Sequence, residues 1–516
     1  MGLLANLIPL LPSAWKLIGI SFAIWILIDV CRGVFRVFTS PFPGPRIAKF
    51  TVLYMRWQQL KGREFLHYHL LHQKYGPIVQ LSPDEISFCH ADALSQIYAG
   101  PRGLDAGDAL SAFKSYGSEN LVTTLDADRH AARRKMVIGH YSNSIAISPG
   151  VQAVFKKYID TFMQIIEEKA SSSPSRTVEI SSWLRWLSAD IILHQIYGES
   201  NHPNLLMSEA SREDFKGLLM TALDFVLGPI ALLITLFPKF ATLLQAIDGP
   251  DKIGMYGMRQ VEAALSDTSD KKEEITTHLK LLSSRLKKDG PTTLLPSKNY
   301  IASDCLDHFI AGYFSPADLF SALIWELSLP WNKVHQDKLR QELHEAGIST
   351  GIHPDILVLQ KLPYLNNVLR ELLRVHTPIP IGLPRKVKRG QNVVVLGAKI
   401  PPGTTIHAQA YSIHRDPQVF PGPDKWNPER WNIPTASPEF REMQKMFWPF
   451  GSGARMCSGM NIAWAELRLV TARIYSTYET KLDDIFLNTN GNLIPEFKRK
   501  DYYPSKLTEP IRFLEI

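Results

Sequence analysis

Residues 450–459 read FGSGARMCSG, and this stretch decides both the fold and the chemistry of the 516-residue chain. Gly451 and Gly453 let the backbone turn tightly around Cys457, so that peptide N–H groups can point at its sulfur. A cysteine held in this way as a thiolate, and shielded from water, is typical of an iron ligand. A buried structural cysteine in a glycine-rich turn is the alternative. The five specified residue types should occur at this spacing by chance in roughly one in ten thousand chains of this length, which favours the iron ligand.

The stretch resembles the haem-binding signature FxxGxRxCxG of the cytochrome P450 family, with every specified position present. Two segments before it stand in the family's order: residues 371–374 (ELLR) are similar to the ExxR helix motif, and residues 428–431 (PERW) to the PERF segment. The resemblance covers about residues 40–510, and fungal members involved in secondary metabolism are the most similar. It implies an α+β fold that is mainly helical with small β-sheets.

The resemblance implies a particular set of haem contacts. Cys457 would be the axial ligand of haem b (iron protoporphyrin IX). The other expected residues of the cofactor-binding loop are Phe450, Gly451, Arg455 and Gly459. The expected propionate contacts outside the loop are His130, Arg134 and Arg385. For His130 and Arg134, which lie four apart in DRHAARRK, a solvated basic helix is the alternative.

The same resemblance implies a buried ion network of Glu371, Arg374 and Arg430 that braces the cysteine loop. Glu-x-x-Arg on its own is an ordinary i,i+3 surface pair, so its order and distance relative to the cysteine loop give it weight. Such a network fixes geometry rather than adding stability. His376 and His414 are expected to be structural.

The sequence departs from the family on the distal side of the haem. The oxygen-activating helix should carry [AG]Gx[DE]T[TS], but residues 311–316 read AGYFSP. The expected catalytic residues are Ala311, Gly312 and Ser315. The Ala-Gly pair is expected to keep the backbone close to the haem, and the Ser315 hydroxyl can donate and accept a proton. Phe314 replaces the acid and can relay nothing, while Pro316 lacks an N–H and is expected to kink the helix.

Two reactions therefore stay open. In the first, the enzyme is a monooxygenase that inserts one oxygen atom from dioxygen into a lipophilic small molecule. In the second, the haem promotes a rearrangement, a dehydration or another atypical oxidation. The first is favoured because the haem-holding features are ordinary. A non-catalytic haem sensor or carrier is disfavoured, because no second output domain is visible in the sequence.

Substrate contacts in this family come from fixed regions of the chain. The corresponding regions here are about residues 101–120, 215–245, 305–316, 378–384 and 490–497. The expected pocket residues are Phe309, Phe314 and Ile381. Such an apolar pocket suits a lipophilic substrate. Asp307 and His308 offer a polar anchor, but an outward-facing turn of the helix is equally compatible with the sequence.

The composition is that of a well-cored globular protein, with 45% hydrophobic and 21% charged residues. The four cysteines lie far apart, which excludes a disulfide framework or a zinc knuckle. The net charge of +7 is spread without a block of like charges, so a solvated basic surface is favoured and no nucleic-acid partner is expected. A basic face that docks an acidic redox partner is also compatible.

The N-terminal residues predict a membrane anchor. Residues 3–30 are almost continuously apolar, broken by Lys16 and Asp29, and approach the ~20 residues needed to cross a bilayer. Basic residues follow on the C-terminal side, which places the rest of the chain in the cytosol. A cleaved secretory signal is the alternative, disfavoured because no basic n-region or clear cleavage site is present.

We therefore expect residues 1–40 to form an anchor with a proline-rich connector, and residues 41–516 to form a single haem-thiolate catalytic domain. The resemblance implies a single-pass protein of the endoplasmic reticulum membrane. Its electrons would come from NADPH through NADPH-cytochrome P450 reductase, and cytochrome b5 is a second donor compatible with this type.

Overall fold

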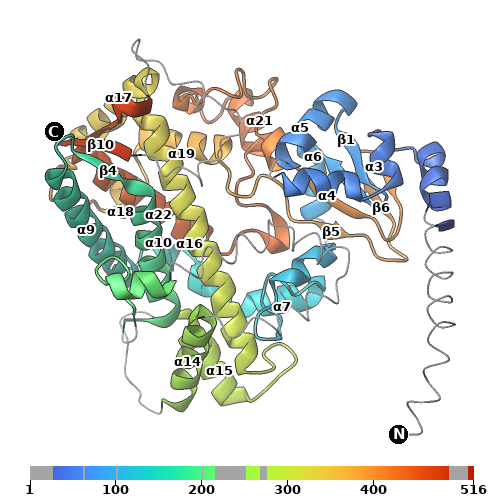
Figure 1. Cartoon of the computed structure of the whole chain (residues 1–516), viewed down its shortest axis with the longest axis horizontal. Helices are drawn as coiled ribbons and strands as arrows, with labels where there is room; N and C mark the ends of the chain where they lie inside the picture. Colours follow the sequence, from blue (N-terminus) through green and yellow to red (C-terminus); the bar gives the residue numbers. More distant parts are fainter. Residues whose placement is uncertain are drawn as a thin grey trace, which may run out of the picture.

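The computed structural model describes residues 27–28, 30–61, 64–99, 103–199, 202–215, 252–267, 276–486 and 510–515. Over these residues the protein is mainly helical with three small sheets, which confirms the predicted mixture (Figure 1). The long helix α16 (Lys298–Ser328) runs through the middle. Most of the other long helices lie on one side of α16, and the five-stranded sheet with its short helices lies on the other.

The remaining longer helices are α9 (Pro149–Ser172), α10 (Ile180–Tyr197), α14 (Lys252–Ser266), α15 (His278–Asp289), α17 (Lys333–Glu345), α19 (Pro363–Val375) and α22 (Met460–Tyr475). The shorter helices are α3 (Arg46–Phe50), α4 (Leu53–Leu60), α5 (Glu64–Tyr75), α6 (Ala91–Tyr98), α7 (Ala127–Val137), α8 (Asn143–Ala146), α18 (Ile356–Leu359), α20 (Ala410–Ile413) and α21 (Pro438–Met446). Single 3₁₀ turns are η2 (Asp108–Phe113), η3 (Ile138–Tyr141), η4 (Pro330–Asn332), η5 (Pro428–Trp431), η6 (Gly453–Arg455) and η7 (Asp484–Phe486).

The largest sheet has the order β1-β2-β8-β5-β3. Its strands are β1 (Ile78–Ser82), β2 (Glu85–Phe88), β8 (Thr405–Ala408), β5 (Arg385–Lys386) and β3 (Asp105–Ala106). Strands β1 and β2 form an antiparallel hairpin, and β8 runs parallel to β2. The other sheets are β4 (Thr177–Glu179) with β10 (Pro510–Glu515) and β9 (Tyr478–Leu482), and the pair β6 (Val393–Val395) with β7 (Ala398–Ile400).

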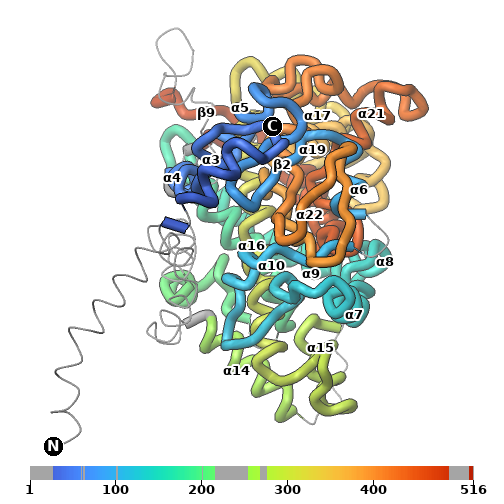
Figure 2. The backbone as a smooth tube through the Cα atoms, turned by 90° about the vertical axis from the view of Figure 1, so that its right-hand side faces the viewer, coloured from blue at the N-terminus to red at the C-terminus, as the bar shows by residue number. Residues whose placement is uncertain are grey.

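The residues at its two ends determine the bounds of helix α16, and its contact with α10 determines its position. The Ser297 hydroxyl accepts the Tyr300 N–H at 3.4 Å as an N-cap, and the chain turns extended at Leu329, just before Pro330. Helices α10 and α16 pack side by side (Figures 1 and 2). The helix runs without interruption past Pro316, which lies inside it.

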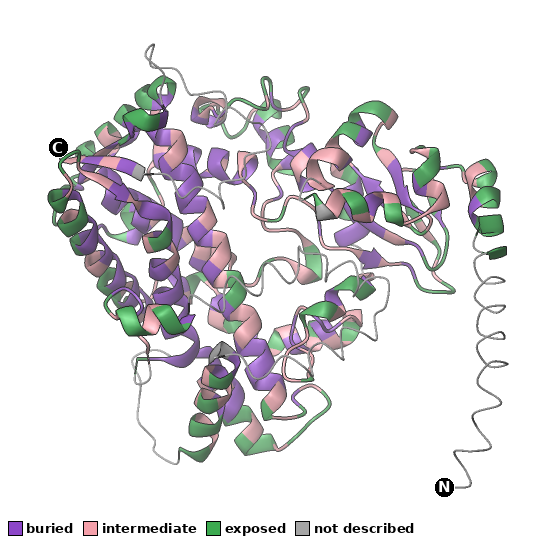
Figure 3. Cartoon of the chain, in the orientation of Figure 1, coloured by how far each residue is buried: buried purple, intermediate pink, exposed green. Residues whose placement is uncertain are grey.

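The main hydrophobic core lies between the long helices, and a second cluster lies against the largest sheet. Nearly every residue of α10 is buried, and buried residues line α9 where it faces α10 (Figure 3). Because α10 contacts both α9 and α16, even its polar residues Ser188, Asp190 and His194 are buried. The core therefore gives α16 and α22 a rigid support.

The expected membrane anchor lies mostly outside the described residues, which begin at Leu27. Among the helices that the structure describes, none combines the length and the apolar character that crossing a bilayer requires. Residues 30–39 are helical and expose apolar side chains, including Phe35 at 67% and Phe38 at 83%.

Candidate active site

Cys457 lies in a tight loop between η6 and α22. Gly451 and Gly453 both have φ of +69°, the left-handed region that favours glycine, as predicted. A Cβ atom on Gly453 would also collide with the carbonyl oxygen of Tyr98. The Cys457 N–H donates to the carbonyl oxygen of Phe450 at 2.9 Å, which closes the loop. Both glycines are therefore required by the turn, and Gly453 is required also by the close approach of α6.

The Cys457 side chain is accessible yet closely surrounded by protein. The side chain is exposed, yet enough protein surrounds it that burial raises the pKa of its thiol. The Gly459 N–H, hydrogen-bonded to the sulfur, and the charge of Arg134 act in the opposite direction. Accessible surface combined with poor solvation is what a ligand position for a large buried cofactor requires.

Arg134 of α7 holds the cysteine loop directly. Its Nη1 atom donates to the Met456 carbonyl oxygen at 2.7 Å and lies 3.3 Å from the Ser458 hydroxyl. These partners flank Cys457 on both sides. The sequence predicted a propionate contact for Arg134, and the structure adds this role in shaping the loop.

A cluster of positive groups surrounds His130. Burial lowers the pKa of His130 to about 3, and the guanidinium groups of Arg455, Arg134 and Arg385 add to the shift. Burial, followed by the charge of Arg385, lowers the pKa of Arg455 to about 10. The Nδ1 atom of His130 is buried without a hydrogen-bond partner among the described residues. The cluster therefore calls for an anion with several acceptor oxygens, and the two propionates of haem fit it.

The acids nearest to this cluster are already paired. Lys388 binds Asp105 at 2.7 Å and Asp126 at 3.5 Å. Arg455 itself donates through Nη2 to the Thr124 and Leu125 carbonyl oxygens at 2.6 and 2.8 Å. These contacts orient the cluster but do not neutralise it.

The residues of the predicted brace meet on one buried carboxylate. Arg374 makes a two-pronged contact with Glu371 at 2.9 and 2.8 Å, and the Nε atom of Arg430 lies 2.9 Å from the same carboxylate. Trp431 donates its indole N–H to it at 3.0 Å. Burial would raise the pKa of Glu371, but the two guanidinium groups and the Asn427 N–H lower it overall. Glu371 is therefore ionised and fully hydrogen-bonded.

His414 connects this network to the cysteine loop. Its Nδ1–H donates to the Arg374 carbonyl oxygen at 3.0 Å, and its Nε2 accepts the Trp448 N–H at 2.9 Å. Arg374 donates back to the His414 carbonyl oxygen at 2.8 Å. His414 is thus structural, as expected. Its link to Trp448, two residues before Phe450, was not predicted from the sequence.

On the distal side, Ala311 is exposed, and Gly312 and Ser315 are partly exposed. A Cβ atom on Gly312 would lie 2.5 Å from Cγ1 of Ile192 in α10. The glycine is therefore explained by the packing of α10 on α16. This packing is a second reason for glycine here, and the expected close approach of the Ala-Gly backbone to the haem stays a prediction.

Phe314, at the position of the missing acid, packs beside Arg185 of α10. The guanidinium carbon lies 5.8 Å from the ring centroid. Arg185 forms an ion pair of 2.8 Å with Asp318, one helical turn further along α16. Arg185 therefore contacts Phe314 with its guanidinium group, but its carboxylate partner is Asp318, four residues later in the helix.

Comparison with known proteins supports the arrangement of these segments. A family model for cytochrome P450 matches residues 43–492. The chain belongs to the cytochrome P450 family. A cytochrome P450 monooxygenase of Aspergillus niger is 26% identical over 452 residues, covering 85% of this chain and 86% of that protein.

Two further relatives lead to the same class of enzyme. A cytochrome P450 monooxygenase of Botryotinia fuckeliana is 26% identical and covers 92% of both chains. The trichothecene C-15 hydroxylase of Fusarium sporotrichioides is 26% identical, covering 92% of this chain and 94% of that protein. This P450 is therefore an oxidoreductase of the monooxygenase class, and its family implies a haem cofactor.

The expected pocket residues of this P450 fall in different places. Phe309 is buried in the main core beside Tyr313 and Phe215. Ile381 packs against a small cluster near β1, and Phe314 lies beside Arg185. Their contact with substrate stays a prediction. Residues 101–102, 216–245 and 490–497 of the expected substrate regions lie outside the described residues.

Proposed function

We propose that this P450 inserts one oxygen atom from dioxygen into a lipophilic small molecule of fungal secondary metabolism. The observation that supports this proposal is the proximal loop, in which the Cys457 side chain is exposed, its sulfur accepts the Gly459 N–H, and Arg134 binds the adjacent Met456 carbonyl oxygen. The relatives named as monooxygenases and as a hydroxylase support oxygen insertion.

The residues of the proximal side have distinct proposed roles. Cys457 would ligate the haem iron, and Phe450, Gly451 and Gly459 would shape the loop around it. His130, Arg455 and Arg385 would bind the propionates, since they form the unneutralised cluster. The Glu371 network and His414 would hold the cysteine loop in its position. When bound, haem supplies the activation of dioxygen that side chains alone cannot provide.

On the distal side, Ser315 is proposed to hold a proton at its hydroxyl oxygen. Phe314 carries no proton, so the transfer to the reacting centre would pass through Ser315, water or a polar group of the substrate. Ala311 would contribute only a small side chain. Replacing Phe314 by Asp together with Ser315 by Thr should raise the fraction of NADPH electrons recovered in product.

The altered distal residues also favour a second candidate, a rearrangement or dehydration at the same haem. Isotope labelling separates the two. Turnover under ¹⁸O₂ should give a product that is heavier by one labelled oxygen atom. A product without label would overturn oxygen insertion and favour the second candidate.

We further propose the cellular arrangement. Residues 41–516 would form one catalytic unit, consistent with the family match from 43 to 492. The apolar N-terminal residues would anchor it to the endoplasmic reticulum membrane. NADPH-cytochrome P450 reductase, with or without cytochrome b5, would dock beside Arg370 and Arg468, which line a groove shared with Phe450. Reduction rates should then fall with rising salt, because the contact is electrostatic.

A further inference from the structure

One stripe of α16 carries accessible side chains although the helix lies inside the molecule. Ile310 is 38% exposed and Ala311 is exposed, whereas Phe309 and Tyr313 are buried at 1% and 2%. Asp307 lies three residues before Ile310 and four before Ala311, so it shares their face of the helix. Its carboxyl group therefore projects from the same face as Ala311.

The Asp307 carboxyl is partly accessible but closely surrounded by protein. The residue is partly exposed, yet burial raises its pKa to about 7; the positive charge of His308 opposes this rise and Asp304 adds to it. An outward-facing turn, which the sequence left open, would be solvated and would not show this shift. Among the described residues, Asp307 makes no hydrogen bond and no ion pair. An ionised carboxylate in such a place has an unfavourable free energy unless a hydrogen-bond donor or a cation contacts it.

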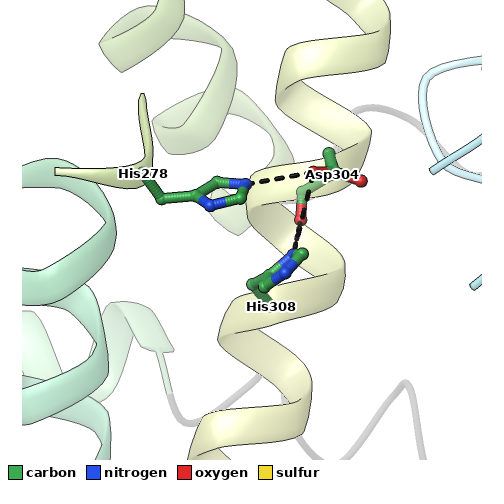
Figure 4. A group of neighbouring side chains, drawn as sticks. All are labelled: His278, Asp304 and His308. Carbon is green, nitrogen blue, oxygen red and sulfur yellow. Dashed lines mark hydrogen bonds and ion pairs between the residues drawn. The ribbon is translucent and has the colours of Figure 1, made fainter. Parts of the chain in front are cut away.

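The neighbouring polar side chains are already engaged (Figure 4). Asp304 accepts the Leu121 N–H at 2.7 Å and lies 3.0 Å from Nε2 of His278. The Nδ1 atom of His308 donates to the backbone oxygen of Asp304 at 2.8 Å. The atoms of this triad lie within 4.8 Å of one another, but these hydrogen bonds use the His278 and His308 nitrogens that would face a metal ion. The triad therefore ties α15 to α16, and among the described residues it leaves the Asp307 carboxyl and the Nε2 atom of His308 without a hydrogen bond.

The Tyr141 hydroxyl of η3 lies near both Asp307 and Cys457. Burial raises the pKa of the Tyr141 hydroxyl, and negative charge at Asp304, Cys305, Asp307 and Cys457 raises it further. Asp307 and Cys457 thus act on the same phenol from different elements. Asp307 of α16 and Cys457 of the loop therefore lie near the same residue, and Asp307 does so from the helix face that also carries Ala311.

We infer that Asp307 anchors a cationic nitrogen on an otherwise lipophilic substrate. This rests on the proposed function, because it assigns one part of that reaction's substrate. An ammonium group would give the poorly solvated carboxylate its missing counter-charge. Ile310 and Phe314, on adjacent turns of the same face, would contact the apolar remainder.

Calorimetric titration of the haem-loaded protein with two probes of equal shape tests the inference. One probe is an aryl-alkyl trimethylammonium ion, and the other is its neutral tert-butyl isostere. The quaternary nitrogen has no lone pair, so it cannot ligate the iron. We expect the wild-type protein to bind the cation about tenfold more tightly or better, and Asp307→Asn to bind both probes equally.

Two further variants sharpen the result. Asp318→Asn is the matched control, because it makes the same substitution on the same helix at a carboxylate already paired with Arg185; it should keep the preference. Asp307→Glu retains the charge and should keep it too, which protects the test if Asp307→Asn folds poorly.

An unchanged preference in Asp307→Asn, or no preference in the wild-type protein, would overturn the anchor. Absorbance of the reduced, carbon-monoxide-bound samples reports thiolate ligation separately. A red-shifted Soret band without cation preference overturns the anchor alone, whereas absence of that band from the wild-type protein overturns the proposed function.

Discussion

His414 receives the Trp448 N–H on its Nε2 atom at 2.9 Å, and this hydrogen bond joins the buried ion network to the segment that leads into the cysteine loop. The other ring nitrogen is fixed on Arg374 at 3.0 Å. Because both nitrogens are used, the imidazole has one tautomer and one orientation. The Cys457 loop therefore depends on a residue 43 positions before it.

Replacing His414 by Phe should destabilise the protein by about 1–3 kcal/mol, because it leaves the buried Trp448 N–H without an acceptor. The fraction of haem that shows the thiolate-type carbon monoxide spectrum should fall as well. Thermal melting and that spectrum measure the two effects. His376→Phe is the control, since His376 contacts only the partly exposed Glu326 in the described structure. Equal losses in both variants would contradict the proposed link.

Lowering the pH should weaken the hydrogen-bonded link that His414 makes between Arg374 and Trp448. Burial, with the charges of Arg374 and Arg415, lowers the pKa of His414 to about 3, while the ordinary histidine value is 6.5. The unfolded chain therefore binds the extra proton between these values, so the stabilisation is complete above pH 6.5 and is lost as the pH falls toward 3. The loss is at most about 1.4 kcal/mol per pH unit. Unfolding free energies at pH 7.5, 6.0 and 5.0 should fall less steeply in His414→Gln, and parallel curves would refute the assignment.

Gly312→Ala should lower the free energy of unfolding by about 1–3 kcal/mol through overpacking, because the new Cβ atom would lie 2.5 Å from the Ile192 side chain. Ile192→Ala on its own leaves a cavity, but combined with Gly312→Ala it should recover part of the loss. A double-mutant cycle on melting temperatures measures this coupling. Strictly additive effects would show that the glycine is required for another reason, such as the approach to the haem.

Glu371→Gln should lower the free energy of unfolding by about 3–5 kcal/mol, because it leaves two buried guanidinium groups without their shared carboxylate. We expect little soluble haem-loaded protein, measured as the ratio of Soret to protein absorbance. Glu442→Gln is the matched surface substitution, since the Lys445–Glu442 pair is exposed and contributes about 0–1 kcal/mol. Comparable yields of the two variants would argue against the brace.

The proximal side could be predicted from the sequence because its residues keep fixed spacing within short segments. FGSGARMCSG carries its own turn geometry, and the positive φ angles of Gly451 and Gly453 follow from local sterics. The mainly helical fold with small sheets followed from the same resemblance.

Contacts between distant segments could not be predicted in this way. The clamp of Arg134 on Met456, the link from His414 to Trp448 and the contact of Gly312 with Ile192 each join residues brought together only by packing. The engagement of the Asp304 carboxylate with His278 depends in the same way on where α15 lies.

The ion pair between Arg185 and Asp318 limits how the family's usual distal acid can be restored. Burial raises the pKa of Asp318, and Arg185 alone counteracts it. An aspartate at position 314 would place a second carboxylate within reach of one guanidinium, and like charges that share a single cation do not both ionise readily. The engineered acid would then compete with Asp318 for its deprotonated state. Reversion toward the common distal pattern at positions 314 and 315 is therefore expected to gain most when the Asp318 carboxylate is neutralised as well.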